Sequence, residues 1–460
     1  MASFFAAPSA AAIPLYLVNK DSWSKLCDEL SAEVVAYALS SGFNASANQH
    51  VMLPGKDGLS AVVFASQTGP RSERFAAGRL VDLLPRGHYR LENRLGIEVE
   101  EDVALAFALS AYRFTRYKPA VPAGARLVLP KGLDRARLER IAAAISLGRD
   151  LVNTPTNDMG PEALEAAALK VAKAYGAKTR VIRGAQLLKQ NFPLIHAVGR
   201  AGAQEPRLVD LSWGKANHPK VTLVGKGVCF DTGGLDIKPS SAMLLMKKDM
   251  AGAATALALA QMIMDAKLPV RLRVLLPMVE NAIAGNAFRP GDVYPSRKGH
   301  TVEIGNTDAE GRLILADALA LGDEESPDLM FVFATLTGAA RVALGPDLPP
   351  FYTMSDALAG DISDMASRVH DPVWRLPLWE AYDPLLNGKI STLVNVSNGP
   401  FAGSITAALF LRRFIEKARE WAHFDIYGWN PSTKPARPEG GEIQTARLLY
   451  ALLAQRFGKR

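Results

Sequence analysis

The chain has 460 residues, which at roughly 150 residues per domain predicts two or three domains. Its 48% hydrophobic and 22% charged residues exclude a disordered, fibrous or low-complexity protein. The two cysteines, Cys27 and Cys229, are too few for a disulfide framework or a Cys-rich zinc site. They fit a reducing compartment, so we expect a cytoplasmic protein. The net charge of +7 would indicate nucleic-acid binding only if the positive charge were concentrated in one region.

The amino-terminal residues predict neither an export signal nor a basic arm. No basic residue precedes Lys20, and Pro8 and Pro14 interrupt the apolar start, so we expect no signal peptide. No apolar run reaches the roughly 18 residues of a membrane span. Residues 1–130 carry 13 Lys/Arg against 12 Asp/Glu. We therefore expect no membrane association, and nucleic-acid binding remains possible but is not favoured.

The first 130 residues predict a small α/β domain. Short apolar segments at 13–18 and 60–65 are typical of strands, and residues 23–40 show a helical pattern. A long helical pattern over 133–152 follows and ends before the turn-forming NTPTN segment. We predict an amino-terminal domain (1–130), a connecting helix (131–152) and a catalytic domain (153–460).

Strand and helix patterns alternate in the third segment. Near-continuous apolar runs occupy four stretches: 221–225, 271–279, 328–336 and 421–428. Helical patterns lie between or beside them at 251–266, 313–323 and 404–418, and residues 431–441 read as a loop. Unalternated apolar strands separated by helices predict an α/β fold with a mostly parallel sheet covered by helices on both faces. Active sites in such sheets lie beyond the carboxyl ends of the strands.

Charged residues follow the first of these predicted strands. Lys226 and Asp231 come directly after it, Lys238 lies beyond a Gly-Gly turn, and Asp249 stands at the start of a predicted helix. Each alone could be a turn former, a surface charge or a helix cap. A phosphate-binding loop is a weak alternative, because Gly227 rather than Ser or Thr follows the lysine.

A second cluster, Asp308, Glu310 and Arg312, precedes the helical pattern at 313–323. Acids at a helix start could simply serve as caps. Together, however, the two clusters supply four carboxylates, which could not all stay ionised side by side without counter-charge. Two divalent ions would balance them, and an oxygen-rich site of this kind suits Mn²⁺, Mg²⁺ or Zn²⁺. No histidine lies in either cluster, so a His-type zinc site is not expected.

These residues resemble the leucine aminopeptidase (cytosol aminopeptidase) family. The resemblance is strongest in NTDAEGRL (306–313), GKGVCFDTGG (225–234) and IKPSSAMLLMKKDMAGAA (237–254). It extends over most of residues 145–430, whereas the first 130 residues show none. The resemblance implies a metallo-exopeptidase with two divalent ions, of which zinc or manganese fit best and magnesium or cobalt are possible.

The resemblance also implies which residues bind the metals. One ion would have four ligands: Lys226, Asp231, Asp249 and Glu310. The second would be held by Asp231, Asp308 and Glu310, so that Asp231 and Glu310 bridge the pair. A lysine ligand must be neutral, and deprotonating a free lysine at pH 7 costs roughly 4 to 5 kcal/mol, which only a bound cation would offset.

Catalytic roles follow by resemblance for two further residues. Lys238 would stabilise the oxyanion of the tetrahedral intermediate, and Arg312 would hold a bicarbonate that acts as general base. A water or hydroxide bridging the metals would attack the peptide bond. The free α-amine of the substrate would bind one metal, which would confine cleavage to the N-terminal residue.

Substrate contacts and assembly are implied as well. Met246 and Thr335 would line the side-chain pocket, although ordinary core packing is an alternative for Met246. The backbone at Leu336, Thr337 and Gly338 would bind the peptide, and Asn306 would shape its loop. A homohexamer is expected. The stretch 435–450 departs from the family pattern, so its effect on the pocket or on subunit contacts stays open.

Two other function classes remain open from the sequence. The pI near 9.2 motivates a DNA-binding hexamer that uses the fold as a scaffold. A two-metal phosphoesterase is the other, since paired metals also bind phosphate.

Overall fold

The computed structural model describes residues 3–56, 58–66, 73–119 and 124–458. It divides the chain into two compact units, Met1–Ser146 with Pro431–Glu439 and Leu147–Asn430 with Gly440–Arg460. The boundary between the units falls within the helix α5 (Arg135–Asn153), close to the helix expected at 133–152. Within the described ranges, no helix combines the length and the apolar character that crossing a membrane requires.

The amino-terminal unit contains a five-stranded sheet in the order β2-β3-β1-β4-β5. Its strands are β1 (Ile13–Val18), β2 (His50–Gly55), β3 (Gly58–Ala65), β4 (Gly87–Leu91) and β5 (Ala125–Val128). Its helices are α1 (Lys20–Glu29), α2 (Ala32–Ser40), the 3₁₀-helix η1 (Ala76–Arg79), α3 (Leu80–Leu83) and α4 (Ile97–Ser110). The helical pattern at 23–40 thus divides into two helices, because Leu30 is extended and the Ser31 side chain accepts a hydrogen bond from Val34 N at the start of α2.

The larger unit is built on a nine-stranded sheet. Eight strands follow one another in the order β15-β14-β17-β13-β8-β10-β7-β6, and β9 pairs with β10 beyond the end of β8. The strands are β6 (Lys178–Arg183), β7 (Arg207–Trp213), β8 (Lys220–Gly225), β9 (Gly227–Asp231), β10 (Arg271–Asn281), β13 (Leu329–Ala334), β14 (Pro350–Tyr352), β15 (Trp374–Arg375) and β17 (Trp421–Asp425). The central strands β17, β13, β8 and β10 are parallel, while β7, β6 and β14 join antiparallel. The four predicted apolar runs are these central strands, so the mostly parallel sheet is confirmed.

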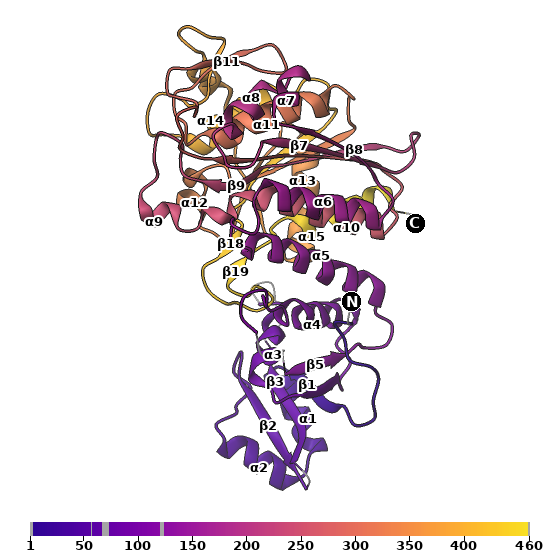
Figure 1. Ribbon diagram of the computed structural model, residues 1–460. Helices are drawn as coiled ribbons and strands as arrows, with labels where there is room; N and C mark the ends of the chain where they lie inside the picture. The colour runs from indigo at the N-terminus through magenta and orange to yellow at the C-terminus, as the bar shows by residue number, and fades with distance from the viewer. Residues whose placement is uncertain (1–2, 57, 67–72, 120–123, 459–460) are drawn as a thin grey trace. The chain divides into compact units, whose positions relative to one another are not determined.

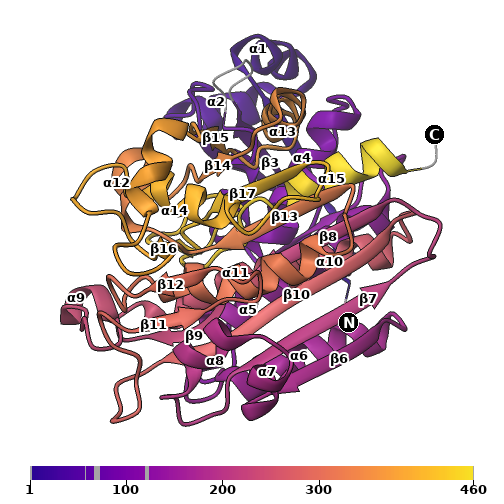
Figure 2. The same ribbon diagram turned by 90° about the horizontal axis from the view of Figure 1, so that it is seen from above.

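Helices cover both faces of this sheet, as predicted. Figure 1 shows α7, α8, α11 and α14 on one face and α6, α10, α13 and α15 on the other, and in Figure 2 α11 lies over the middle of the sheet. The helices are α6 (Pro161–Ala174), α7 (Ala185–Lys189), α8 (Pro193–Gly199), α10 (Ala251–Asp265), α11 (Glu310–Asp323), α13 (Asp356–Val369), α14 (Gly403–Arg412) and α15 (Ala446–Phe457). The remaining elements are α9 (Ser240–Met243), η2 (Met246–Met250), β11 (Val293–Pro295), β12 (Thr301–Glu303), α12 (Gly338–Leu344), η3 (Glu380–Leu386), β16 (Leu393–Val394), β18 (Trp429–Asn430) and β19 (Gly440–Gly441).

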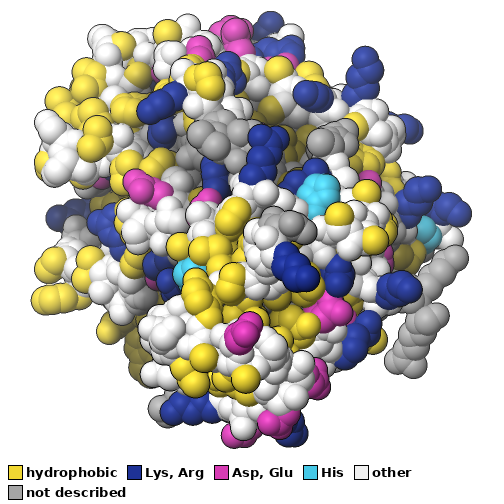
Figure 3. Space-filling view, turned by 90° about the horizontal axis from the view of Figure 1, so that it is seen from below, with side chains coloured by type: hydrophobic (Ala, Val, Ile, Leu, Met, Phe, Trp, Pro, Cys, Tyr) yellow, Lys and Arg dark blue, Asp and Glu magenta, His cyan; other side chains and the backbone are white. Residues whose placement is uncertain are grey.

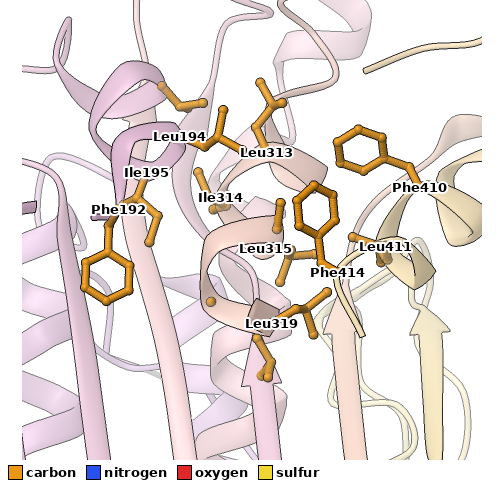
Figure 4. Packing of buried hydrophobic residues seen from close by; sticks show 14 of the residues in the cluster. Phe192, Leu194, Ile195, Leu313, Ile314, Leu315, Leu319, Phe410, Leu411 and Phe414 are labelled. Carbon is orange, nitrogen blue, oxygen red and sulfur yellow. The ribbon is translucent and has the colours of Figure 1, made fainter. Parts of the chain in front are cut away.

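Helix α11 is fixed by apolar packing on the upper face. Its residues Leu313, Leu315 and Leu319 are fully buried in a cluster that also contains Leu194 of α8 and Phe410 of α14 (Figure 4). Burying a large apolar side chain contributes about 1.5–3 kcal/mol. The start of α11, which carries Glu310, is therefore held in a fixed place relative to the sheet.

Helix α14 ends at Arg412, earlier than the predicted helical stretch at 404–418. The carboxylate of Asp323 accepts hydrogen bonds from the backbone N–H groups of Glu416, Lys417 and Ala418 at 2.7–2.9 Å. Those donors would be used within the helix if it continued. The apolar residues after Arg412 are buried, which explains why the sequence pattern runs past the end of the helix.

Candidate metal centre

The first cluster of charged residues begins at the carboxyl end of β8. Lys226 lies between β8 and β9, and its backbone N–H donates to Phe333 O at 2.9 Å. Strand β9 then places Asp231 at its own end. The Asp231 Oδ1 atom accepts hydrogen bonds from Gly233 N and Asn281 Nδ2, both at 2.8 Å, so the carboxylate has a fixed orientation.

Asp249 reaches the same place from the short 3₁₀-helix η2, which leads into α10. Its Oδ1 atom accepts a hydrogen bond from Thr335 Oγ1 at 2.6 Å, and Thr335 follows the end of β13. The carbonyl of Thr335 in turn accepts from Lys226 Nζ at 3.0 Å. Thr335 therefore orients two members of the cluster at once.

The second cluster is positioned by a loop that Asn395 holds. Asn395 Oδ1 accepts from Gly305 N at 2.7 Å and Asn306 N at 3.2 Å, and its Nδ2 donates to Asn306 O at 2.7 Å. The Asn306 side chain accepts from Asp308 N at 2.6 Å. Glu310 follows as the first residue of α11.

The two clusters meet, as the sequence led us to expect. Carboxylate oxygens of Asp231, Asp308 and Glu310 lie within 4.8 Å of one another, and this group of acids contains no histidine. Lys226 Nζ lies 2.8 Å from Asp249 Oδ2 and 2.9 Å from Glu310 Oε1. These contacts gather five of the predicted residues into one site.

Two further cations border this group of acids. Lys238 Nζ lies 2.9 Å from Asp231 Oδ2 and forms a second ion pair with Asp308. Arg312 is buried in the first turn of α11, and its Nη1 donates to Asn395 O at 2.6 Å. Burial lowers the pKa of Arg312 to about 10, so the guanidinium still carries its charge at neutral pH.

Gly311 allows Lys226 to approach α11. A Cβ atom at this position would lie 2.7 Å from both Cε and Nζ of Lys226. Any side chain here would push the ammonium group away from its carboxylate partners. Steric contact with Lys226 therefore explains why a glycine stands at this position of the NTDAEGR segment.

Burial and mutual repulsion disfavour charge on the acids. Burial, with the negative charge of Asp249 beside it, raises the pKa of Asp231 to about 6. Burial and the neighbouring Asp231 raise the pKa of Glu310 well above its usual value. For Lys226, burial lowers the pKa, but Asp249 and Glu310 outweigh it and leave the pKa above the usual value. Cations placed among these acids would therefore stabilise their ionised forms.

The donor set fits divalent metal ions. Three carboxylate oxygens, Asp249 Oδ2, Asp308 Oδ1 and Glu310 Oε1, are buried without a hydrogen bond of good geometry and face lysine ammonium groups instead. Unpaired buried carboxylate oxygens are costly, and hard divalent cations are their natural partners. Lys226 could join them as a ligand only by losing its proton.

A pocket of about 650 Å³ opens over the cluster. Twelve of the thirteen residues predicted for metal binding, catalysis or substrate contact line it, including Met246, Asn306, Thr335, Leu336, Thr337 and Gly338. Glu310 is buried and does not belong to this lining. The backbone N–H groups of Leu336 and Thr337 already donate to Asp425 Oδ1, at 2.9 and 3.2 Å.

Three residues that hold the site together were not predicted from the sequence. Asn281 binds Asp231, Asn395 binds the 305–309 loop, and Asp425 binds the segment after β13. Asn281 and Asp425 are polar residues at the ends of apolar strands, and that position was the available signal. Asn395 follows β16, but that strand has only two residues and gives no apolar run that could be recognised in the sequence.

The surface offers no support for a concentrated nucleic-acid contact on the face seen in Figure 3. There the Lys and Arg side chains are dispersed among acidic, apolar and other side chains rather than gathered into one stripe. Protein–DNA affinity depends on clustered phosphate contacts. On this face the positive charge is therefore scattered rather than clustered.

Both units of the chain match models of known protein families. Residues 146–450 match the model of the cytosol aminopeptidase family catalytic domain, and residues 13–130 match the M17 aminopeptidase N-terminal domain. A probable cytosol aminopeptidase of Chlamydia trachomatis is 42% identical over 295 residues, which are 63% of this chain. That match spans only 59% of the length of the Chlamydia protein.

Two solved structures are similar over nearly the whole chain. The crystal structure of the cytosol aminopeptidase from Coxiella burnetii has a TM-score of 0.95 at 44% identity and covers 99% of both chains. The bottromycin maturation enzyme BotP in complex with Mn has a TM-score of 0.87 at 33% identity, covering 97% of this chain and 100% of BotP. With its acid cluster, its two matched domains and these similarities, the chain belongs to the cytosol aminopeptidase family.

Proposed function

We propose that the protein is a metal-dependent aminopeptidase that removes the N-terminal residue from peptides. The observation that carries this proposal is the convergence of Asp231, Asp308 and Glu310 within 4.8 Å, beside the buried Lys226. Family membership supports the reaction class. The pocket above the acids is large enough to admit the end of a peptide.

The acids and Lys226 would hold two divalent ions. Lys226, Asp231, Asp249 and Glu310 would bind one, and Asp231, Asp308 and Glu310 the other. Zinc or manganese is the expected metal, with magnesium or cobalt as alternatives, and the Mn complex of BotP supports manganese. When bound, such ions polarise the scissile carbonyl, lower the pKa of water and anchor a free amine.

Other residues of the chain would orient the substrate and move protons. Lys238 points its ammonium group into the acid cluster, where it could stabilise negative charge on the carbonyl oxygen. Arg312 lines the pocket and could hold a bicarbonate that accepts a proton. Of the other acids, Asp425 also lines the pocket, but its oxygens already accept hydrogen bonds from Leu336 N, Thr337 N and the Thr337 hydroxyl.

The pocket wall would bind the peptide. Met246 and Thr335 would contact the N-terminal side chain, and Asn306 would keep Asp308 in place through the bond to its N–H. Because Asp425 takes the N–H groups of Leu336 and Thr337, the peptide would meet the carbonyl groups of the 336–338 segment.

Location, assembly and domain roles complete the proposal. We place the protein in the cytoplasm, as the names of its relatives suggest, and expect a homohexamer. The segment 153–460 would be the catalytic domain, preceded by the amino-terminal domain (1–130) and the helix at 131–152. All thirteen predicted site residues lie in that catalytic segment.

Metal reconstitution tests the proposed activity. The protein is stripped with a chelator and supplied separately with Mn²⁺, Zn²⁺, Mg²⁺ or Co²⁺. Leucine p-nitroanilide should be hydrolysed only after metal is restored, while the N-acetylated substrate should not react. Hydrolysis of p-nitrophenyl phosphate without anilide turnover would select a phosphoesterase, and salt-sensitive retention of duplex DNA without turnover would select a DNA-binding protein.

A further inference from the structure

Lys248 is a buried lysine that has no anionic partner among the residues that the structure describes. Its residue is only 5% exposed, and its Nζ atom lies 4.4 Å from the centre of the Tyr427 ring. Among the described residues, no carboxylate or carbonyl oxygen accepts a hydrogen bond from this ammonium group. The neighbouring Lys247 differs, because its Nζ donates to Asn153 O at 2.8 Å.

A second cation shares the same aromatic ring. The guanidinium carbon of Arg341, in α12, lies 5.3 Å from the centre of the Tyr427 ring. Arg341 is exposed and forms no ion pair with any residue that the structure describes. Two positive side chains thus meet on one tyrosine, and a cation–π contact contributes less than an ion pair to a buried charge.

The nearest carboxylates are committed to other partners. Asp249 is bound by Lys226 and Thr335. Asp425 accepts from two backbone N–H groups and from the Thr337 hydroxyl, at 2.7–3.2 Å. A buried charge without a partner is costly, so an anionic group of a ligand that reached Lys248 would supply the partner that the protein's own acids do not.

This charge lies in the wall of the substrate pocket. Lys248, Tyr427 and Arg341 line the same pocket as Met246 and Asp249, and Lys248 immediately precedes Asp249 in the chain. A peptide whose amine is anchored at the acid cluster would therefore place its first side chain in the space that Lys248 borders. A carboxylate on that side chain would meet the ammonium group directly.

We propose that Lys248 is a specificity-determining residue that binds the side-chain carboxylate of an acidic N-terminal residue, glutamate or aspartate. The inference rests on the proposed aminopeptidase function and names its substrate class. Arg341, on the same ring and exposed at the pocket, adds attraction for the incoming negative charge.

A comparison of matched substrates tests the proposal. Glutamyl and glutaminyl p-nitroanilides have nearly the same shape and lack a C-terminal carboxylate, so the ratio of their kcat/KM values reports the side-chain charge. Wild-type protein loaded with Mn²⁺ should favour glutamyl over glutaminyl by about tenfold, the effect of one charge-assisted hydrogen bond. Lys248→Met, which keeps length and removes charge, should bring the ratio close to one.

The neighbouring lysine provides the matched control. Lys247→Met removes the same charge one residue away, outside the pocket lining, and should keep the wild-type ratio. A wild-type ratio of one or less, or an unchanged ratio in Lys248→Met, overturns the proposal. The wild-type ratio decides the question even where the Lys248 variant does not fold.

Two further measurements separate the remaining explanations. Lys248 could instead bind the C-terminal carboxylate of short peptides. In that case Lys248→Met will lower turnover of Leu-Ala relative to Leu-Ala amide, and the ratio of glutamyl to glutaminyl anilide turnover will be one. That result overturns the side-chain assignment. Calorimetric binding of free glutamate and glutamine gives the same comparison without turnover. Tighter glutamate binding that Lys248→Met abolishes supports the inference, whereas failure to hydrolyse any anilide contradicts only the proposed activity.

Discussion

Lys226 and Glu310 form a buried ion pair, with Nζ 2.9 Å from Oε1. The lysine comes from the junction of β8 and β9, and the glutamate is the first residue of α11. Gly311 leaves the space through which the two approach. This pair joins the two clusters of charged residues at the place where the metal ions are proposed to bind.

Glu310→Gln should abolish metal binding and turnover while preserving the fold. The substitution keeps shape but removes a carboxylate proposed to bridge both ions. Loss of an outer partner of a metal ligand costs about 10–100-fold in affinity, so loss of a ligand should cost more. Calorimetry with Mn²⁺ and leucine p-nitroanilide assays measure both effects, and the circular dichroism spectrum checks the fold. Near-normal turnover would remove Glu310 from the ligand set.

Thr335→Val should weaken metal binding about 10–100-fold without removing a ligand. The Thr335 hydroxyl donates to Asp249 Oδ1 at 2.6 Å, and valine has nearly the same shape without this donor. Thr335→Ser retains the hydroxyl and serves as the control. Equal Mn²⁺ affinities in the valine variant and the wild type would show that Asp249 does not need this orientation.

Metal-induced stabilisation should increase with pH. The pKa of Asp231, raised by burial to about 6, exceeds the value near 3.9 of an unfolded aspartate. Between these values the metal-free folded state binds more protons than the unfolded state, so this group makes stability fall as pH rises. Above about pH 6 a bound metal ion neutralises the ionised Asp231 carboxylate, whereas below that pH protons compete with the metal for it.

Melting temperatures at pH 5.0 and 7.5, with Mn²⁺ or with chelator, test this linkage. At a free metal concentration 100 times Kd, binding adds about 2.7 kcal/mol of stability. The Mn²⁺-dependent increase in Tm should be larger at pH 7.5. Asp231→Asn should lose most of the increase. An increase that is equal or larger at pH 5.0 would contradict the linkage.

Turnover should depend on bicarbonate through Arg312. The guanidinium is buried, lines the pocket and keeps its charge at neutral pH, so it can hold a small anion. Bicarbonate added to degassed buffer should raise kcat, by up to the 10²–10⁴-fold of a general base. Chloride at equal ionic strength is the control, and Arg312→Ala should remove the dependence. A wild-type rate that bicarbonate leaves unchanged would exclude this role.

The sequence predicted the sheet and the meeting of the two clusters for a simple physical reason. Buried parallel strands require continuous apolar runs, as in β8 (Lys220–Gly225) and β13 (Leu329–Ala334). The carboxyl ends of such strands share one edge, so charges that follow them in sequence are brought together in space. Lys226 and Thr335 are examples.

Features that depend on tertiary contacts escaped prediction. The extra strand β9 forms because it pairs with β10 beyond the end of β8. Helix α14 does not extend to residue 418 because Asp323 accepts from the backbone N–H groups of Glu416, Lys417 and Ala418. The role of Asn395 was not predicted, because its contacts with the 305–309 loop form only in the folded protein. Lys248 was not predicted as a site residue, because only the folded structure places its ammonium group against the Tyr427 ring in the pocket wall.

The amino-terminal unit shows a different limit. Periodicity predicted the strands at 13–18 and 60–65 and the helical stretch at 23–40, yet residues 1–130 gave no resemblance, although residues 13–130 match a family model. All thirteen predicted site residues lie outside residues 1–130, so no short motif of site residues identified this unit.

Anomalous diffraction from crystals of the Mn²⁺-reconstituted protein tests the central claim most directly. Two manganese peaks should appear among Asp231, Asp249, Asp308 and Glu310, with Lys226 Nζ bound to one of them. Full manganese occupancy elsewhere in the crystal, with no peak between these side chains, would contradict the account.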